Sequence, residues 1–158
     1  PDVKLFLNDY DTEERGKARY IANLVSSLQE KGLIDGIGLQ THLGIEIPSL
    51  VDVDRSIKEY GKLGLEIHIT ELDMDLTEHT EEELFRQARR YKRLFSFLKT
   101  IQEEKAANIT NITFWGLTDD SSWLNKPGKS SYPLLFDEYL LQKPAFWGVV
   151  LNPDIPLV

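Results

Sequence analysis

The sequence predicts an α/β fold in which strands and helices alternate and the strands form a parallel sheet. Short apolar runs typical of buried strands recur roughly 30 residues apart, with one longer spacing, and this is the period of βαβ units. Segments with apolar residues at helical spacing lie between them, and each apolar run ends in polar side chains. Together these patterns favour consecutive strand–helix units with right-handed crossovers.

Four strands are expected, at residues 3–8, 35–40, 65–73 and 111–116. The third run follows Gly64 and is rich in β-branched residues, so it is expected to be buried on both faces. It ends in Glu71 and Asp73, which have equal parity and should point the same way. A carboxylate pair at the end of a buried strand is costly unless it has a role.

The first helix is expected to be capped by Asp11 or Thr12, with Glu13 and Glu14 in its first turn, and to end near Gly32.

Pro48 and Ser49 introduce a second helix. The run 80–83 (Thr-Glu-Glu-Glu) fits a capping box and begins a long third helix. A last short helix is expected around Trp147, which we assign to the core, and a loop at residues 121–133 precedes it.

Four parallel strands with helices on one face would leave the other face bare. The fold is therefore either a doubly wound sheet or half of a closed (β/α)8 barrel. A doubly wound nucleotide-binding domain should show a glycine-rich loop after its first strand, and residues 8–12 (NDYDT) do not resemble one. Gly36 and Gly38 share one face of their strand, which suits a crowded barrel interior or a close backbone approach. We therefore predict half a barrel, with residues 1–158 in a single domain.

Composition excludes several classes of function. The formal net charge of −8 and the pI near 4.9 argue against nucleic acid or an anionic membrane as a partner. The chain has no cysteine, which excludes disulfides, thiolate catalysis and zinc–thiolate sites. No apolar run approaches the ~20 residues of a membrane helix. The chain opens almost directly on a strand, as an internal fragment would.

Polar residues at the four strand ends should converge, because a barrel builds its site from the carboxyl ends of its strands. Carboxylates, an imidazole, amides and two indoles are the groups that a sugar site needs. The candidates are Asn8, Tyr10, Gln40, His42, Glu71, Asp73, Trp115 and Trp123.

Other types of site are less favoured. His42, Glu71 and Asp73 could form a metal site, but they come from different strands without local ligand spacing. A serine triad would need a Gly-x-Ser-x-Gly elbow, which does not occur. Asp9 and Asp119 are left unassigned, because strand-end aspartates also bond backbone groups. No cofactor or metal is expected.

Four segments, in the same order, resemble glycoside hydrolase family 10, the endo-β-1,4-xylanases. They are LFLNDY (5–10), IDGIGLQTHL (34–43), ITELD (69–73) and TFWGLTD (113–119). The segments YPLLFD (132–137) and KPAFW (143–147) are similar to the closing part of that family. The resemblance implies a retaining (β/α)8-barrel enzyme, of which this chain would be the last four units.

The resemblance also implies roles for single residues. Glu71 would be the nucleophile, His42 would hydrogen-bond it, and Asp73 would hydrogen-bond His42. Gln40 would bind sugar hydroxyls, Trp115 and Trp123 would enclose a xylose unit, and Asn8 and Tyr10 would line the cleft. Xylan or a xylo-oligosaccharide would be the substrate, and the family implies secretion.

The second carboxyl group that retaining hydrolysis requires is expected outside this chain. In the family it lies in an Asn-Glu motif on the fourth strand, and no Asn-Glu dipeptide occurs here. We therefore expect the chain to pair with an N-terminal half-barrel or with a second copy of itself. The alternatives are a non-catalytic carbohydrate-binding half-barrel and a structural fragment.

Overall fold

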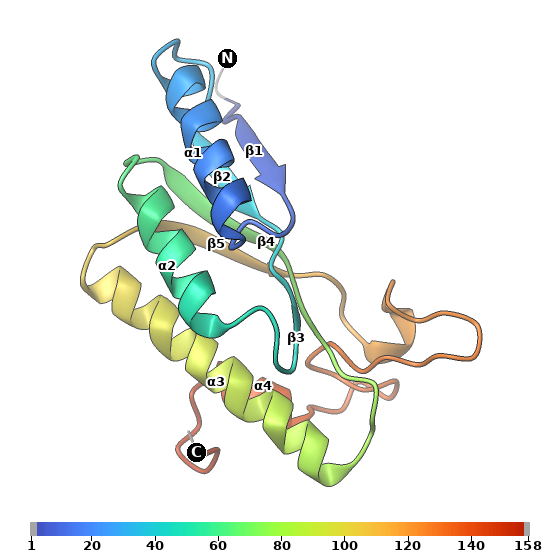
Figure 1. Ribbon diagram of the computed structural model, residues 1–158. Coiled ribbons are helices and arrows are strands. Elements are labelled where there is room, and N and C mark those ends of the chain that lie inside the picture. Colours follow the sequence, from blue (N-terminus) through green and yellow to red (C-terminus); the bar gives the residue numbers. More distant parts are fainter. Residues whose placement is uncertain (1–2, 157–158) are drawn as a thin grey trace. The chain divides into compact units, whose positions relative to one another are not determined.

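The computed structural model describes residues 3–156, which fold into two compact units (Figure 1). The first unit contains the chain up to Thr41, with Pro48–Leu72 and Leu98–Thr113. The second contains His42–Ile47, Asp73–Phe97 and the chain from Phe114 onward. Within the described residues, no helix is both long and apolar enough to cross a bilayer.

The sheet of the first unit contains β1 (Phe6–Asp9), β2 (Gly36–Leu39) and the early part of β4 (Glu66–Asp75). The order is β1-β2-β4 and both pairings are parallel, with Gly36 opposite Phe6 on one side and Glu66 on the other. β5 (Asn108–Phe114) pairs with β4. The predicted parallel α/β sheet is therefore confirmed.

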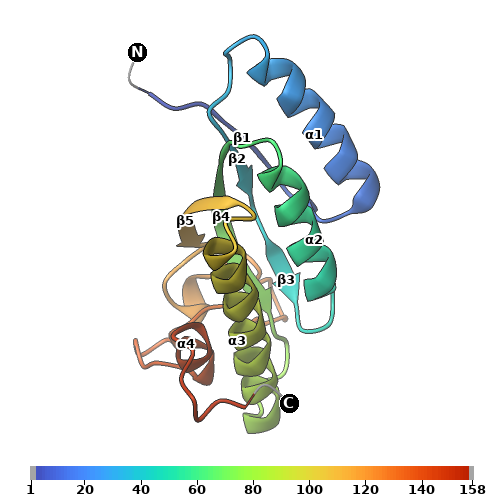
Figure 2. The ribbon, with the colours of Figure 1, turned by 90° about the vertical axis from the view of Figure 1, so that its left-hand side faces the viewer.

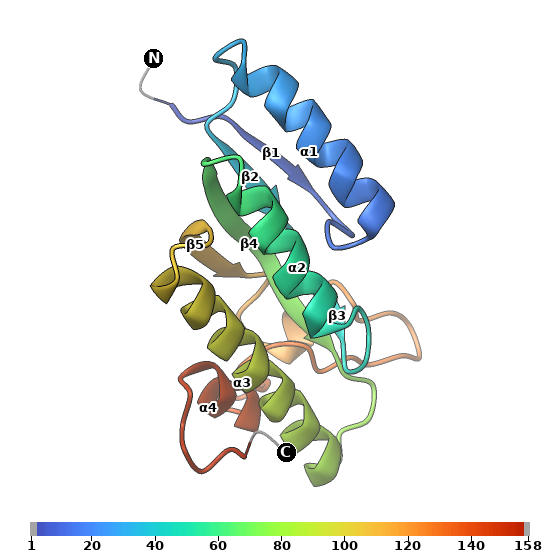
Figure 3. The same cartoon turned by 60° about the vertical axis from the view of Figure 1, so that its left-hand side comes forward.

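Two helices, α1 (Arg15–Gln29) and α2 (Leu50–Gly61), lie side by side on one face of this sheet (Figures 2 and 3). Their apolar sides and the alternate residues of β2 and β4 form the core, because successive strand residues point to opposite faces. Its fully or nearly fully buried members include Ile21, Val25, Ile37, Leu39, Ile57, Tyr60, Ile67 and Ile69.

The opposite face of this sheet is not buried in the same way, so the prediction of a strand buried on both faces is wrong for this part of β4. Ile67 and Ile69 are fully buried, whereas the alternate residues Glu66, His68 and Thr70 are only partly covered. Phe6 lies on this second face, and its ring stacks on His68 with 4.1 Å between the ring centres. A Cβ at Gly36 would overlap the Phe6 ring, so glycine makes room for that side chain, as predicted.

α2 begins as predicted, because the Ser49 hydroxyl accepts a hydrogen bond from the Asp52 N–H. α1 begins later than predicted: its cap is Glu14, whose carboxylate accepts from the N–H groups of Gly16 and Lys17. Asp11 and Thr12 therefore do not cap it. The reason is tertiary, since the preceding loop is fixed to α2.

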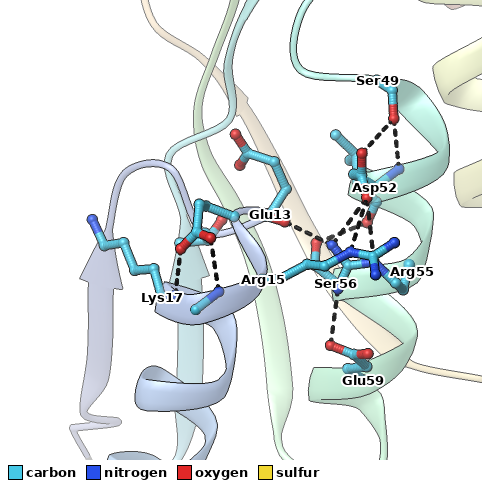
Figure 4. Close-up of polar contacts among 12 residues, drawn as sticks. Glu13, Arg15, Lys17, Ser49, Asp52, Arg55, Ser56 and Glu59 are labelled. Atoms are coloured by element: carbon cyan, nitrogen blue, oxygen red, sulfur yellow. Dashed lines mark hydrogen bonds and ion pairs between the residues drawn. The ribbon is translucent and has the colours of Figure 1, made fainter.

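That loop is fixed by a polar network between α1 and α2 (Figure 4). The Arg55 guanidinium donates to the Glu13 carbonyl at 2.8 Å and also pairs with Asp52 and Glu59. The buried Tyr60 hydroxyl donates to the Thr12 carbonyl at 2.8 Å. The chain between β1 and α1 is thereby attached to α2.

The second unit contains a strand that the sequence did not predict, β3 (His42–Gly44), which pairs in parallel with the end of β4. It also contains most of α3 (Glu81–Glu103), the short 3-10 helix η1 (Asp119–Ser121) and α4 (Pro144–Val149). α3 begins as predicted, with the Glu83 N–H bonded to the Thr80 hydroxyl, but the Glu83 carboxylate pairs with Arg86.

α4 packs closely on α3 (Figures 1 and 3), since a Cβ at Gly148 would lie 2.2 Å from the Ala88 carbonyl oxygen. This short helix buries Ala145 and Gly148, and it leaves Trp147 41% exposed. The assignment of Trp147 to the core is therefore wrong, because six helical residues present only one narrow face to α3.

Candidate active site

In the first unit, Asn8 at the end of β1 bonds two side chains of β4. Its amide nitrogen donates to the Glu71 carboxylate at 3.1 Å, and its amide oxygen accepts from the Thr70 hydroxyl at 2.7 Å. Both polar atoms of the carboxamide are engaged, which fixes its orientation. The structure therefore brings together two of the predicted site residues, Asn8 and Glu71.

Asn8 reaches β4 by passing over β2, because Gly38 leaves room for it. Asn8 pairs with Gly38 and Gly38 with His68 in the sheet register. A Cβ at Gly38 would lie 2.5 Å from the Asn8 amide oxygen. The glycine is therefore needed for the close approach of the Asn8 side chain, as the sequence indicated.

The pleat of β4 shifts by one residue before Glu71. In a regular parallel strand, N–H groups that face one neighbour recur at every second residue. The Glu66 N–H donates to the Asp35 carbonyl and the Glu71 N–H to the Gln40 carbonyl, and these donors are an odd number of residues apart. Such an irregularity re-aims a side chain. It explains how two consecutive residues, Thr70 and Glu71, both reach Asn8.

Gln40 and Tyr10 lie at the ends of the neighbouring strands. Gln40 is half-buried, and its backbone joins the Asp9 carbonyl (3.0 Å) to the Glu71 N–H (3.1 Å). Tyr10 is 56% exposed, and the Lys17 ammonium lies 3.6 Å from the centre of its ring. Lys17 also pairs with Asp9 at 3.0 Å, which gives this unassigned aspartate a structural partner.

In the second unit, Asp73 connects His42 to Trp123. One Asp73 oxygen lies 2.9 Å from His42 Nδ1, and the other accepts from the Trp123 indole N–H at 2.8 Å. Asp73 is only 1% exposed. Because a carboxylate can only accept hydrogen bonds, the contact with Asp73 places a proton on Nδ1 of His42. Nε2 is the other ring nitrogen that can form a hydrogen bond.

Trp123 also packs against the imidazole that it helps to position. Its ring centre lies 5.0 Å from that of His42, with the two planes inclined by 56°. Trp123 is nevertheless 55% exposed, so much of the indole surface is open for contact with a ligand. The structure thus joins three of the predicted site residues, His42, Asp73 and Trp123.

Trp115 follows the end of β5 and is 46% exposed, which excludes a fully buried core position. It precedes Gly116, whose backbone lies close to Leu134 and has a φ of +144°. A side chain is disfavoured there, so the glycine is needed for the turn that follows Trp115.

Sequence reasoning missed a buried ion pair in the second unit. The Lys143 ammonium lies 2.7 Å from the Asp119 carboxylate, and both side chains are almost fully buried. Burial raises the pKa of Asp119 and lowers the pKa of Lys143, while their mutual attraction opposes both changes. A lysine beside a proline looks like a surface residue in the sequence, so only its burial reveals this role.

The described residues contain no group of three or more His, Asp or Glu side chains that could hold a metal ion. The chemistry available is that of carboxylates oriented by hydrogen-bond donors. Glu71 is held by an amide, and Asp73 by an imidazole and an indole. Exposed indole surface adjoins the second group, and this combination suits a sugar site.

Residues 1–152 match the model of the family described as glycosyl hydrolase family 10. The chain is 42% identical to an endo-1,4-beta-xylanase of Geobacillus stearothermophilus, over 95% of this chain and 48% of the relative. It is 43% identical to TsXylA, an intracellular xylanase of Thermoanaerobacterium saccharolyticum, with a TM-score of 0.83 over 94% of this chain and 44% of that structure.

A GH10 structure from Paenibacillus barcinonensis matches with a TM-score of 0.89 and 33% identity, over the whole of this chain and 48% of that one. The chain therefore spans about half the length of these relatives. Two mutants of the Thermoanaerobacterium enzyme, each with one glutamate replaced by alanine, have been solved with xylotetraose and with xylotriose.

These matches confirm the predicted fold, which is part of a (β/α)8 barrel. The family includes an intracellular member, so membership does not by itself imply the secretion that we expected. The match covers nearly the whole chain, and the likeness extends to solved structures above 30% identity. The chain belongs to glycosyl hydrolase family 10.

Proposed function

We propose that this chain is the half of a retaining endo-1,4-β-xylanase domain that carries the nucleophile, Glu71. The observation that carries the proposal is the Asn8–Glu71 hydrogen bond, found in a chain of this hydrolase family. A nucleophilic carboxylate must be held in one orientation and kept ionised, and a hydrogen-bond donor favours both. The relatives named above are xylanases, so xylan or a xylo-oligosaccharide is the proposed substrate.

In the first step, an oxygen of Glu71 attacks the anomeric carbon and forms a glycosyl–enzyme ester. A second carboxylic acid gives its proton to the departing sugar oxygen. Water then attacks the anomeric carbon, loses a proton to that second carboxylate, and releases Glu71. The two carboxyl groups must lie ~5–5.5 Å apart in a retaining enzyme.

His42 and Asp73 support the nucleophile in this proposal. Asp73 holds the proton of the imidazole on Nδ1, and we assign the other ring nitrogen, Nε2, to hydrogen bonding with Glu71. Asp73 follows Glu71 by two residues along the same strand, which is the support for this assignment. Gln40 would bind sugar hydroxyls and Tyr10 would line the cleft. The exposed indole surfaces of Trp115 and Trp123 would cover a xylose unit.

The second carboxyl group would come from an N-terminal half-barrel, or a second copy of the chain would close the barrel. The support is the share of the relatives that this chain spans and the lack of an Asn-Glu dipeptide. We further propose that both units belong to one catalytic domain, because the chain passes between them repeatedly. The alternative is a carbohydrate-binding half-barrel without catalysis.

Hydrolysis of an aryl β-xylobioside tests the proposal. The chain alone should be inactive, the chain with its N-terminal half should be active, and Glu71→Gln should abolish that activity while xylo-oligosaccharide binding persists. Glu78→Gln, in an exposed loop, is the matched control and should remain active.

Two outcomes would overturn parts of this proposal. Activity of the chain alone would refute the division of the carboxyl groups between two halves. Sugar binding by the combined halves without any hydrolysis would favour the carbohydrate-binding alternative.

A further inference from the structure

The buried Lys143–Asp119 pair connects the closing segment of the chain to the turn that carries Trp123. Lys143 is 4% exposed, and its ammonium donates to the carbonyls of Tyr132 and Leu134, each at 2.8 Å. Its third contact is the Asp119 carboxylate at 2.7 Å. The buried ammonium therefore forms two hydrogen bonds and one ion pair inside the protein.

Asp119 forms hydrogen bonds with its backbone as well as with its side chain. Its second carboxylate oxygen accepts from the Leu134 N–H at 2.8 Å, and its own N–H donates to the Phe136 carbonyl at 3.1 Å. Its carbonyl accepts from the Ser122 N–H at 3.2 Å and from the Asn125 amide at 2.7 Å. One residue thus attaches the turn at residues 119–125 to the segment at residues 134–136.

Trp123 lies inside that turn. Its exposed indole has one polar anchor among the described contacts, the hydrogen bond to Asp73 at 2.8 Å. The position of the indole N–H therefore depends on how the turn is held. Within the described part of the chain, two side chains donate to Asp73, the Trp123 indole and His42.

A buried ion pair is weak support for stability, because desolvation offsets the attraction, and apolar replacements of similar volume are often as stable. A positional role accounts for the pair better, since each charged side chain also bonds the backbone of another segment. The pair and these bonds together hold the turn at residues 119–125 in one arrangement.

We propose that Lys143 and Asp119 are positioning residues that hold Trp123 where its indole N–H bonds Asp73, and so keep Asp73 oriented toward His42. This inference goes beyond the family assignment and rests on the proposed function only for its effect on catalysis. Neither residue contacts the reacting atoms in this scheme. Their effect reaches His42 through Trp123 and Asp73.

The first test is spectroscopic and independent of activity. The double variant Asp119→Leu/Lys143→Met removes both charges together, so no unpaired charge remains. In NMR spectra of the full chain, the Trp123 indole N–H signal, assigned with Trp123→Phe, should shift and lose protection from solvent exchange. The matched control is Lys99→Met/Glu103→Leu, which removes an exposed ion pair and should leave that signal unchanged.

The second test is kinetic and uses the chain combined with its N-terminal half. The double variant should lower kcat by about 10- to 100-fold, the cost of a misplaced group, and should also raise KM, because Trp123 covers the proposed xylose unit. Adding Trp123→Phe should lower kcat no further, because the pair acts through Trp123.

An unchanged indole signal in the folded variant would overturn the proposal, as would fully additive losses of kcat. If the double variant does not fold, Asp119→Asn/Lys143→Gln removes both charges with side chains of similar size, and the amide oxygen at position 119 can still accept the Leu134 N–H. The indole signal of this variant should shift and lose protection from solvent exchange. The indole signal could shift in the double variant while Glu71→Gln remains active. That result would support the positioning role of Lys143 and Asp119 and would refute only the proposed nucleophile.

Discussion

The Asn8 side chain crosses over Gly38 to donate a hydrogen bond to the Glu71 carboxylate, 3.1 Å away. The two residues come from β1 and β4, and β2 lies between these strands in the sheet. Gly38 in β2 has no side chain, and this leaves the room that Asn8 of β1 needs to contact Glu71 of β4.

Gly38→Ala should therefore act as a site mutation. The new Cβ would lie 2.5 Å from the Asn8 amide oxygen and would displace the carboxamide from Glu71. A hydrogen bond to a charged group is worth about 1.5–3 kcal/mol, so kcat/KM for an aryl xylobioside should fall by about 10- to 100-fold. Asn8→Ala should cause a similar loss, and the double variant should lose little more. Independent losses that multiply would show that Gly38 acts by another route.

Tyr60→Phe should destabilise the first unit. The buried hydroxyl donates to the Thr12 carbonyl, and its removal leaves that carbonyl without this partner. The expected loss is about 1–3 kcal/mol in the free energy of unfolding, measured by urea denaturation. Tyr20→Phe is the control, because Tyr20 is 67% exposed and should change stability little. Equal effects of the two substitutions would exclude the buried hydrogen bond as the cause.

The cap of α1 should make stability depend on pH. The N–H groups of Gly16 and Lys17 bond the Glu14 carboxylate and lower the pKa of that group below its ordinary value of 4.5. Because the pKa of Glu14 is lowered in the folded state, its cap contributes fully to the stability of the fold above pH 4.5. This contribution is lost as the pH falls through the folded-state pKa. Wild type should therefore have a higher Tm than Glu14→Gln at pH 6, and the difference should shrink in acid. A difference that is constant from pH 6 to pH 3 would contradict this account.

Gly148→Ala should disrupt the contact of α4 with α3, because the added Cβ would lie 2.2 Å from the Ala88 carbonyl oxygen. Overpacking against backbone costs about 1–3 kcal/mol or more, since the backbone cannot turn aside. Thermal denaturation should show a lower Tm. Ala145→Gly, in the same helix, removes volume without a clash and serves as the comparison. A smaller loss for Gly148→Ala than for Ala145→Gly would contradict the close packing.

Sequence reasoning predicted the parallel α/β order and the start of α2, because Ser49 caps that helix with its own side chain. It misplaced the start of α1, because Arg55 and Tyr60 hold the preceding loop in a turn outside the helix. Contacts between residues distant in the chain decided that boundary, and local capping preferences do not contain them.

Of the contacts in the candidate site, the hydrogen bond between Asp73 and His42 was predicted, whereas those made by Asn8 and Trp123 were not. Asn8 bonds both Thr70 and Glu71 because the pleat of β4 shifts by one residue. The alternation of residues along the sequence does not reveal such a shift. β3 was missed because Thr41, with a φ of +62°, interrupts the chain between β2 and β3. A non-glycine residue in that region is unexpected from local preferences.

The central claim is that Glu71 is the nucleophile, and trapping the covalent intermediate tests it most directly. A 2-deoxy-2-fluoro-β-xylobioside with a good leaving group should inactivate the combined halves, because the fluorine slows hydrolysis of the ester. Peptide mass spectrometry should then find the added sugar on the peptide that contains Glu71, and Glu71→Gln should remain unlabelled. Labelling of a different carboxylate, or labelling that persists in Glu71→Gln, would contradict the assignment.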